Sequence, residues 1–149
     1  DYVVTEAGVA ADLGGEKFLD LVCRQAGFSP DVIVVVASVR ALMTHGGADV
    51  NVPGSFTTDT LEKGVSNLDK HVRNMKSYGV PVIVSINHFE SDDPTHIDFL
   101  RRHCRELGAE CVTNDGFIKG GEGAKDLATK VVEVLDRGQK DFRYLYDLK

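Results

Sequence analysis

Asp31-Val-Ile-Val-Val-Val-Ala37 is a nearly continuous run of β-branched residues in a chain of 149 residues. Such a run predicts a strand that is buried on both faces, as in a parallel sheet with helices on each side. Pro81-Val-Ile-Val-Ser-Ile-Asn87 has the same pattern, and a long amphipathic segment lies between the two runs. This alternation predicts βαβ units. The predicted fold class is therefore α/β, with a mostly parallel sheet covered by helices on both faces.

Two shorter signals extend the predicted sheet, at residues 2–5 and at residues 110–113. Between the strands, apolar residues recur at helical spacing. The first of these helices carries Phe18, Leu21 and Val22 on one side, which predicts that this side faces the core. The predicted helices span residues 13–25, 60–78, 94–107 and 124–135.

Turn residues separate these elements. Gly27 follows the first helix and is predicted to end it, and Asp93-Pro94 provides a cap and a first-turn proline for the third helix. Residues 43–58 are polar and glycine-rich, which is typical of a functional loop. We find no internal repeat, and the length suits one domain spanning residues 1–149. The tail is predicted to pack on that domain through its apolar and aromatic residues, Phe142, Tyr144, Leu145 and Tyr146.

The composition excludes several classes of function. Apolar residues make up 42% of the chain and charged residues 27%, as in an ordinary globular protein. The net charge of -6 argues against nucleic-acid binding, and no apolar run approaches the roughly 20 residues that span a membrane. Cys23, Cys104 and Cys111 form no C-x-x-C pair and no zinc-like spacing, which indicates reduced thiols in a cytoplasmic protein and no metal site.

Ligands bind at the carboxyl ends of the strands in a parallel sheet. Each predicted strand is followed by polar, glycine or aromatic residues, which should meet at one edge of the sheet. The first two loops contribute Glu6, Gly8 and Asp12, then Arg40 and His45. The last two contribute Asn87, His88 and Phe89, then Asp115, Phe117, Lys119, Gly120 and Gly121. The sequence therefore predicts a ligand site at this edge.

Each of these residues also has a purely structural interpretation. Glu6 and Asp12 fit an acid/base pair or a metal site, but Asp12 equally fits a helix N-cap beside a solvated carboxylate. Arg40 fits either an anion site or an internal ion pair with a partner such as Glu6. His45 fits a catalytic or a solvated residue, and Phe89 fits a core position, a lid or a stacking surface.

Two nucleotide-binding patterns are incomplete in this chain. Gly120-Gly-Glu-Gly123 is no phosphate loop, because G-x-x-x-x-G-K-[ST] occurs nowhere in the sequence. Its glycines suit close approach to a ligand or a tight turn. Asn87-His88-Phe89 partly matches the Asn-Lys-x-Asp turn of GTPases, but His88 replaces the lysine and Asp92 comes two positions late. A GTPase-type domain is therefore the least favoured interpretation.

The start of the chain provides the most specific match. Asp1-Tyr-Val-Val-Thr-Glu-Ala-Gly-Val-Ala-Ala-Asp12 resembles the D-Y/I-V-V-T-E-A-G-F-G-A-D segment of formate–tetrahydrofolate ligase, where it lies in the middle of a longer polypeptide. The order and spacing of further segments fit the same family. They are residues 14–18, 34–42, 45–47, 64–70, 79–89, 119–123 and 145–148.

This resemblance implies a part of an ATP-dependent ligase. Family members join formate to tetrahydrofolate through formyl phosphate, giving 10-formyltetrahydrofolate, ADP and phosphate. ATP with Mg²⁺ and tetrahydrofolate are then small-molecule substrates rather than tightly bound cofactors, and the full-length enzyme is expected to be a homo-oligomer. The implied topology is P-loop-NTPase-like, but the phosphate loop lies upstream in the family. The fragment is thus expected to supply the folate side and to be inactive alone.

The resemblance also implies roles for individual residues. Phe89, in the N-x-F turn with Asn87, and Phe117, where the family has Trp, correspond to the two aromatics that stack on the pterin. Glu6, Asp12, Arg40 and His45 match positions near the nucleotide–folate cleft, with unassigned steps, and Gly8, Lys119, Gly120 and Gly121 match its nucleotide or phosphate vicinity. Val9-Ala10 replaces the family's Phe-Gly. These departures leave open a diverged, non-catalytic relative that acts as an interaction or regulatory module.

Overall fold

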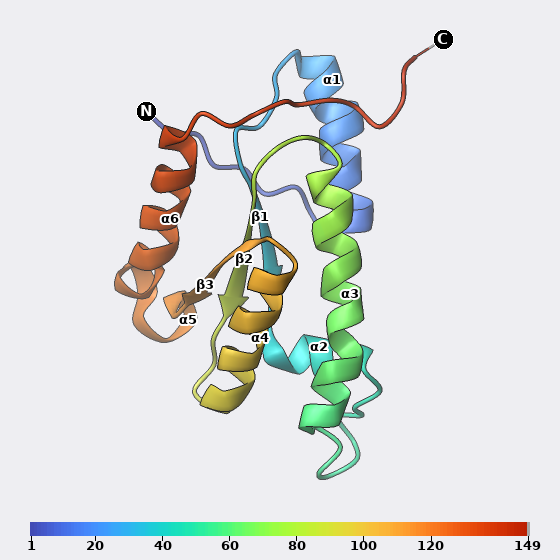
Figure 1. Cartoon of the computed structure of the whole chain (residues 1–149), viewed down its shortest axis with the longest axis vertical. Coiled ribbons are helices and arrows are strands. Elements are labelled where there is room, and N and C mark those ends of the chain that lie inside the picture. Colours follow the sequence, from blue (N-terminus) through green and yellow to red (C-terminus); the bar gives the residue numbers. More distant parts are fainter. Residues whose placement is uncertain (149) are drawn as a thin grey trace.

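The two apolar runs form neighbouring parallel strands, as Figure 1 shows for the computed structural model, which describes residues 1–148. The sheet has three strands in the order β1 (Ile33–Ala37), β2 (Val82–Asn87) and β3 (Glu110–Asn114), all parallel. The predicted α/β class and parallel sheet are confirmed. The central strand, β2, is buried from its first residue to Ile86 because it has a neighbour on each side.

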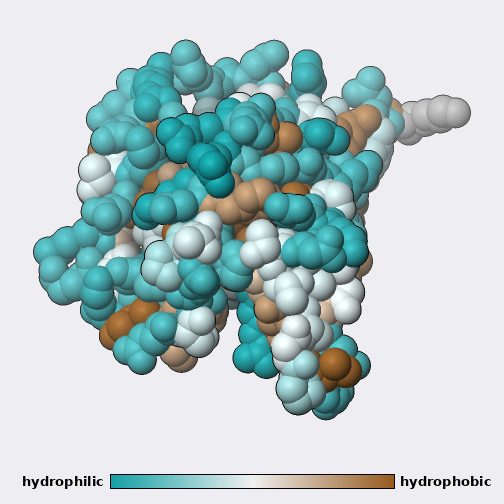
Figure 2. All heavy atoms as spheres, turned by 60° about the horizontal axis from the view of Figure 1, so that its bottom comes forward, coloured by the Kyte–Doolittle hydropathy of each residue, from teal (hydrophilic) through white to brown (hydrophobic). Residues whose placement is uncertain are grey.

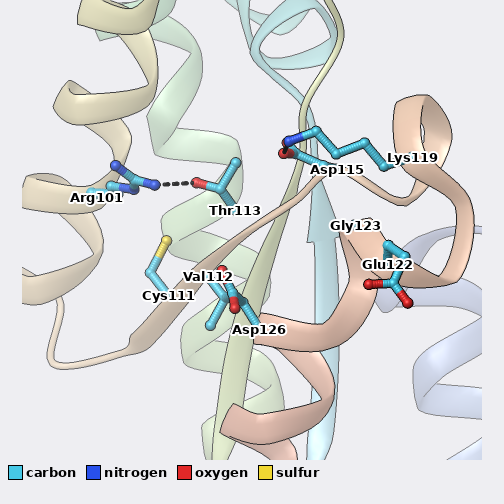
Figure 3. Close-up of a pocket in the computed structure, with 9 residues that line it drawn as sticks. All are labelled: Arg101, Cys111, Val112, Thr113, Asp115, Lys119, Glu122, Gly123 and Asp126. Carbon is cyan, nitrogen blue, oxygen red and sulfur yellow. Dashed lines mark hydrogen bonds and ion pairs between the residues drawn. The ribbon is translucent and has the colours of Figure 1, made fainter.

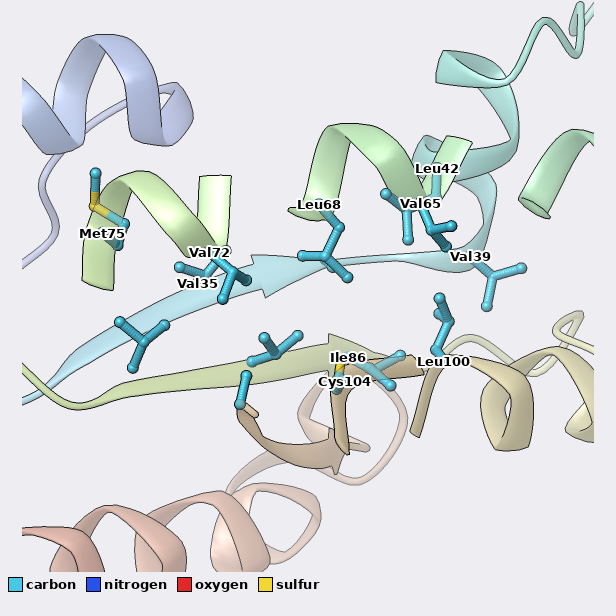
Figure 4. Packing of buried hydrophobic residues seen from close by; sticks show 14 of the residues in the cluster. Val35, Val39, Leu42, Val65, Leu68, Val72, Met75, Ile86, Leu100 and Cys104 are labelled. Atoms are coloured by element: carbon cyan, nitrogen blue, oxygen red, sulfur yellow. The ribbon is translucent and has the colours of Figure 1, made fainter. Parts of the chain in front are cut away.

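One face of the sheet carries the main core. Helices α2 (Val39–His45), α3 (Thr58–Lys76) and α4 (Pro94–Glu106) provide its side chains together with β1 and β2. Figure 4 shows these side chains meeting between the helices and the strands. The cluster includes Val35, Leu42, Leu61, Leu68, Val72, Met75, Ile86, Leu100 and Cys104.

The second face is covered only in part. Helix α6 (Lys125–Asp136) contacts β3, which is the edge strand opposite β1. Val34 and Val36 of β1 point to this second face and are 38% and 63% exposed. Helices do lie on both faces as predicted, but the prediction that β1 is buried on both faces is wrong. An unbroken apolar run does not reveal whether a helix will reach an edge strand.

Helices α2 and α3 cross at unusually close range because each has a glycine at the contact. A Cβ placed on Gly46 would lie 1.7 Å from the carbonyl oxygen of Thr60, and one on Gly64 would lie 1.8 Å from that of Leu42. The start of α3 is fixed by a capping box in which the Thr57 and Thr60 side chains bond to each other's backbone N–H groups. The predicted second helix is therefore confirmed.

The two later helices also follow the prediction. Asp93 caps α4 by accepting a hydrogen bond from the Thr95 backbone N–H, and a proline occupies the first turn. The last helix, α6, spans Lys125–Asp136. It is preceded by a short helix, α5 (Gly116–Lys119), and a 3₁₀ turn, η3 (Gly120–Ala124), where the sequence predicted only a loop.

The first helix differs from its prediction in winding and orientation. It consists of two π-helical segments, η1 (Ala10–Gly15) and η2 (Phe18–Val22), and then α1 (Cys23–Ala26), which ends at Gly27 in the left-handed conformation (φ 71°). Of the side predicted to face the core, Phe18 packs against it, whereas Leu21 and Val22 are 49% and 38% exposed. Leu19, Asp20 and Cys23 are buried instead. Wide π-helical turns change which residues share a face.

Residues 2–5 do not form the predicted strand. They have no regular structure, and Val3 and Val4 are 90% and 92% exposed. A strand is stable only when its backbone groups pair with a neighbour, and within residues 1–148 only β1, β2 and β3 pair with one another. The segment is apolar, but it does not form a strand, so the predicted strand is wrong.

The C-terminal tail packs on the domain, as predicted. The Tyr78 and Phe142 rings stack with centroids 6.4 Å apart, and the backbone N–H of Arg143 donates to the carbonyl of Tyr78. Asp20 receives a 2.6 Å hydrogen bond from the Tyr78 hydroxyl and a 3.2 Å bond from the Leu145 N–H. Burial, together with the hydrogen bond from its hydroxyl to Asp20, raises the pKa of Tyr78 well above its ordinary value. Among the described helices, none is both long and apolar enough to cross a membrane.

Candidate functional site

The carboxyl ends of β2 and β3 lie side by side. Asn87 pairs with Asn114 in the sheet register, and the Asn114 side-chain amide donates a 3.3 Å hydrogen bond to the Asn87 side-chain oxygen. The His88 N–H then donates to the Asn114 carbonyl at 3.1 Å. Two turns leave the sheet at this point, and the register places them next to each other.

Each turn presents one phenylalanine. The ring centroids of Phe89 and Phe117 are 5.1 Å apart with an angle of 54° between the planes, so the rings contact each other directly. Phe117 is 80% exposed, whereas Phe89 is half-buried. A flat ring stacked between them needs about 7 Å, twice the roughly 3.5 Å of an aromatic carbon contact. The pair forms an apolar surface in this state, and a ligand ring enters between them only if they separate.

Charged side chains connect the same two turns. Asp115 accepts hydrogen bonds from His88 Nδ1 at 2.8 Å and from Lys119 Nζ at 2.6 Å, one on each carboxylate oxygen. The bond from Lys119, followed by the bond from His88, holds the pKa of the Asp115 carboxyl below its ordinary value. The same carboxylate raises the pKa of Lys119.

A polar cavity of about 350 Å³ opens beside β3, and Figure 3 shows its lining. Arg101 of α4 reaches across it and donates a 2.8 Å hydrogen bond to the Thr113 hydroxyl. Both signs of charge are present, which suits a ligand with hydrogen-bond donors and acceptors rather than a simple ion. The lining residues are Arg101, Cys111, Val112, Thr113, Asp115, Lys119, Glu122, Gly123 and Asp126.

Cys111, which lines this cavity, is hydrogen-bonded to the buried thiol of Cys104. A hydrogen bond from Cys104 and the nearby charge of Arg101 and Arg105 lower the pKa of Cys111. The bond to Cys111, with burial, raises the pKa of Cys104. Both cysteines are free thiols.

The glycine-rich turn supports the Asp115 loop. A Cβ on Gly123 would lie 2.4 Å from the Asp115 carbonyl carbon, and the Asp115 N–H donates to the Gly123 carbonyl at 3.1 Å. Gly120 has a positive φ of 59°, while Gly121 has open space around it. The sequence left two uses open for these glycines, close approach to a ligand or a tight turn. The tight turn accounts for Gly120 and Gly123.

The β1 loop lies apart from this cluster. Arg40 and His45 are exposed residues of α2, and the Arg40 guanidinium lies 5.2 Å from the centroid of the Phe56 ring. Within residues 1–148, no hydrogen bond or ion pair joins Arg40 to Glu6. The suggested internal partner of Arg40 is therefore wrong.

The residues after the unformed first strand also lie elsewhere. Glu6 and Asp12 are exposed, and Asp12 lies in the first turn of η1 rather than at its N-cap, which is Val9. A Cβ on the neighbouring Gly15 would lie 3.5 Å from Met75 Sδ, near the C-terminal end of α3 and so toward the amino end of β2. Without strand pairing at residues 2–5, nothing directs Glu6, Gly8 and Asp12 to the carboxyl edge.

The structure thus joins two of the four predicted loops. It also adds residues that the sequence did not single out, namely Arg101, Thr113 and Asp126. Arg101 and Asp126 lie inside helices with ordinary charged faces, where no local pattern distinguishes them. Among residues 1–148, no group of three or more His, Cys, Asp or Glu side chains is arranged to hold a metal ion.

Figure 2 brings the carboxyl edge of the sheet forward and shows a mostly hydrophilic surface with separate apolar patches. This fold and site define a class, an α/β protein with a parallel sheet and an aromatic and polar cluster at two adjoining strand ends. Comparison with known sequences narrows the class. The sequence profile of the family formate–tetrahydrofolate ligase matches residues 1–149, and the chain belongs to that family.

Curated relatives agree with this assignment. The chain is 45% identical over 146 residues to a formate–tetrahydrofolate ligase of Granulibacter bethesdensis, covering 98% of this chain and 26% of the relative. It is 47% identical over 149 residues to one of Limosilactobacillus reuteri, covering 100% of this chain and 27% of the relative. The chain therefore spans about a quarter of the length of these relatives.

Proposed function

We propose that this chain supplies the folate-facing part of a ligase that makes 10-formyltetrahydrofolate from formate, tetrahydrofolate and ATP. The observation that carries the proposal is the contact between Phe89 and Phe117 on adjoining strand ends. Two rings on separate turns can take up a flat heteroaromatic group by moving apart. Each face of a pterin then gains a stacking partner, typically worth about 1–3 kcal/mol for a base-sized ring.

The polar cavity supports the same assignment. A pterin carries ring N–H and amino donors beside carbonyl and ring-nitrogen acceptors. The Asp126 carboxylate can accept from its donors, and Arg101 and the Thr113 hydroxyl can donate to its acceptors. The cavity volume of about 350 Å³ is within the usual range for small-molecule sites.

The chemistry divides the reaction between this part and the rest of the polypeptide. Formate is a poor acyl donor until phosphorylation by ATP turns one of its oxygens into a leaving group. N10 of the folate then attacks the formyl carbon, and phosphate departs. The sheet belongs, on this proposal, to a larger P-loop-NTPase-like sheet whose phosphate loop lies outside these residues. Residues 1–149 alone are therefore inactive.

The test uses the full-length ligase that contains this sequence. Phe89→Leu and Phe117→Leu keep an apolar side chain but remove the ring, and each should raise the KM for tetrahydrofolate about 10-fold while the KM for ATP stays unchanged. Val36→Thr, on the exposed face of β1, is the control. Unchanged tetrahydrofolate KM in both phenylalanine variants would refute the proposal.

A diverged, non-catalytic relative is the second candidate. Its specific support is Ala10, which has φ 60° and is the one residue other than glycine with positive φ in the described chain. The related segment of the family has Gly at this place, so the positive φ is kept here without the glycine that suits it. Ligase activity of the full-length protein would exclude this candidate.

A further inference from the structure

The separation of the two aromatic rings depends on how firmly their turns are held together. Phe89 follows β2 and Phe117 lies in α5 after β3, so the chain joins the two segments only by way of α4 and β3. Backbone pairing ends with the bond from the His88 N–H to the Asn114 carbonyl. Beyond that point, side chains must fix one turn against the other.

Asp115 is the residue that makes this connection. One oxygen of its carboxylate accepts from His88 Nδ1, directly before Phe89, and the other accepts from Lys119 Nζ, two positions after Phe117. Figure 3 shows the Lys119 amine directed at this carboxylate. The Asp115 and His88 side chains are 24% and 30% exposed, so the bond between them is partly shielded from water.

The backbone of Asp115 is itself tightly fixed. Its carbonyl accepts hydrogen bonds from the N–H groups of Ile118 and Lys119, both at 2.9 Å, and its own N–H donates to Gly123. The contact with Gly123 leaves no room for a side chain at that position. A carboxylate on so rigid a loop sets the positions of the groups that it binds.

We propose that Asp115 is a positioning residue of the folate site, whose carboxylate holds the Phe89 turn through His88 and the Phe117 turn through Lys119. The inference rests on the proposed function, because the rings matter for activity only if a pterin binds them. The negative charge of the Asp115 carboxylate strengthens both bonds, and the role requires a hydrogen-bond donor at position 88 rather than histidine itself. Arginine or lysine there should serve as well.

The experiment measures the KM values for tetrahydrofolate, ATP and formate, with kcat and the melting temperature, in the full-length ligase. Asp115→Asn and His88→Leu should raise the KM for tetrahydrofolate about 10-fold, the effect of losing one hydrogen bond to a charged group, and leave the KM for ATP unchanged. His88→Arg, which keeps a donor at this position, should have the same KM for tetrahydrofolate as the parent enzyme. Lys125→Met is the matched control, because it removes the exposed Lys125–Glu122 ion pair of the same region without touching Asp115.

Two outcomes would overturn the inference in distinguishable ways. If Phe89→Leu raises the tetrahydrofolate KM but His88→Leu and Asp115→Asn do not, Asp115 has no positioning role and the folate site stands. If the phenylalanine variants also leave that KM unchanged, the proposed function fails and the inference fails with it. Should Asp115→Asn fail to fold, the pair His88→Leu and His88→Arg decides alone: equal KM values for tetrahydrofolate in these two variants would refute the role.

Discussion

The close crossing of α2 and α3 makes a specific prediction for Gly64→Ala. The new Cβ would lie 1.8 Å from the Leu42 carbonyl oxygen. An ordinary carbon–oxygen contact is about 3.3 Å, so the two helix backbones must separate by about 1.5 Å. Overpacking of this kind costs about 3 kcal/mol when backbone has to move. The intrinsic preference of helices for alanine returns up to about 1 kcal/mol. The expected net loss is about 2 kcal/mol.

Equilibrium urea unfolding of residues 1–149, followed by far-UV circular dichroism, measures this loss. With a slope of about 2 kcal/mol per molar urea, the midpoint should fall by about 1 M. Gly15→Ala is the matched control, since its Cβ would meet Met75 Sδ at 3.5 Å, an ordinary contact. That variant should be equal to the parent or more stable. A Gly64→Ala midpoint within about 0.2 M of the parent would refute the reasoning.

Four further predictions concern strain, a buried pair, pH and the pterin site. Ala10→Gly should stabilise the chain by about 1 kcal/mol in urea unfolding, because φ 60° disfavours a side chain; a loss of stability would contradict this. Tyr78→Phe leaves a buried oxygen of Asp20 without its donor, and the free energy of unfolding should fall by about 1–3 kcal/mol. Hydrogen bonds from Lys119 and His88 lower the pKa of Asp115, so its contribution to stability is complete above the unfolded value of about 3.9 and is lost as the pH falls through the lower folded value. Urea midpoints measured from neutral to acid pH should therefore fall less steeply in Asp115→Asn than in the parent, and parallel curves would exclude the effect. In the full-length ligase, Phe117→Trp enlarges the stacking surface and should lower the tetrahydrofolate KM, whereas an increase would indicate that the cavity has adapted to the smaller ring.

Sequence patterns predicted the parts of the fold that depend on local chemistry. The amphipathic spacing specifies α3, and Asp93-Pro94 specifies the start of α4. The apolar run of β2 is buried as predicted because this strand is central. The aromatic tail packs, because exposing Phe142 and Tyr144 to water would be unfavourable.

Predictions failed where the outcome depends on a neighbour. Residues 2–5 have strand-forming side chains, but strand formation needs a partner strand, which none of the described residues provides. Val36 lies in a run that is as apolar as the buried strand β2. It is nevertheless exposed, because α6 covers β3 and not β1. The candidate residues Glu6 and Asp12 followed from the missing strand, so their expected position at the carboxyl edge failed with it.

The sequence by itself determined the α/β class, the approximate bounds of the three later predicted helices, the family, and the place of Phe89 and Phe117 just after two strands, because each depends on residue type and spacing within a short segment. Only the tertiary structure decided that Asp115 joins His88 and Lys119, and that Arg101 and Asp126 line the same cavity. These groups come from separate elements, and the parallel register of β2 and β3 brings them together. No local pattern contains that register, since it is set by packing of the whole sheet against its helices.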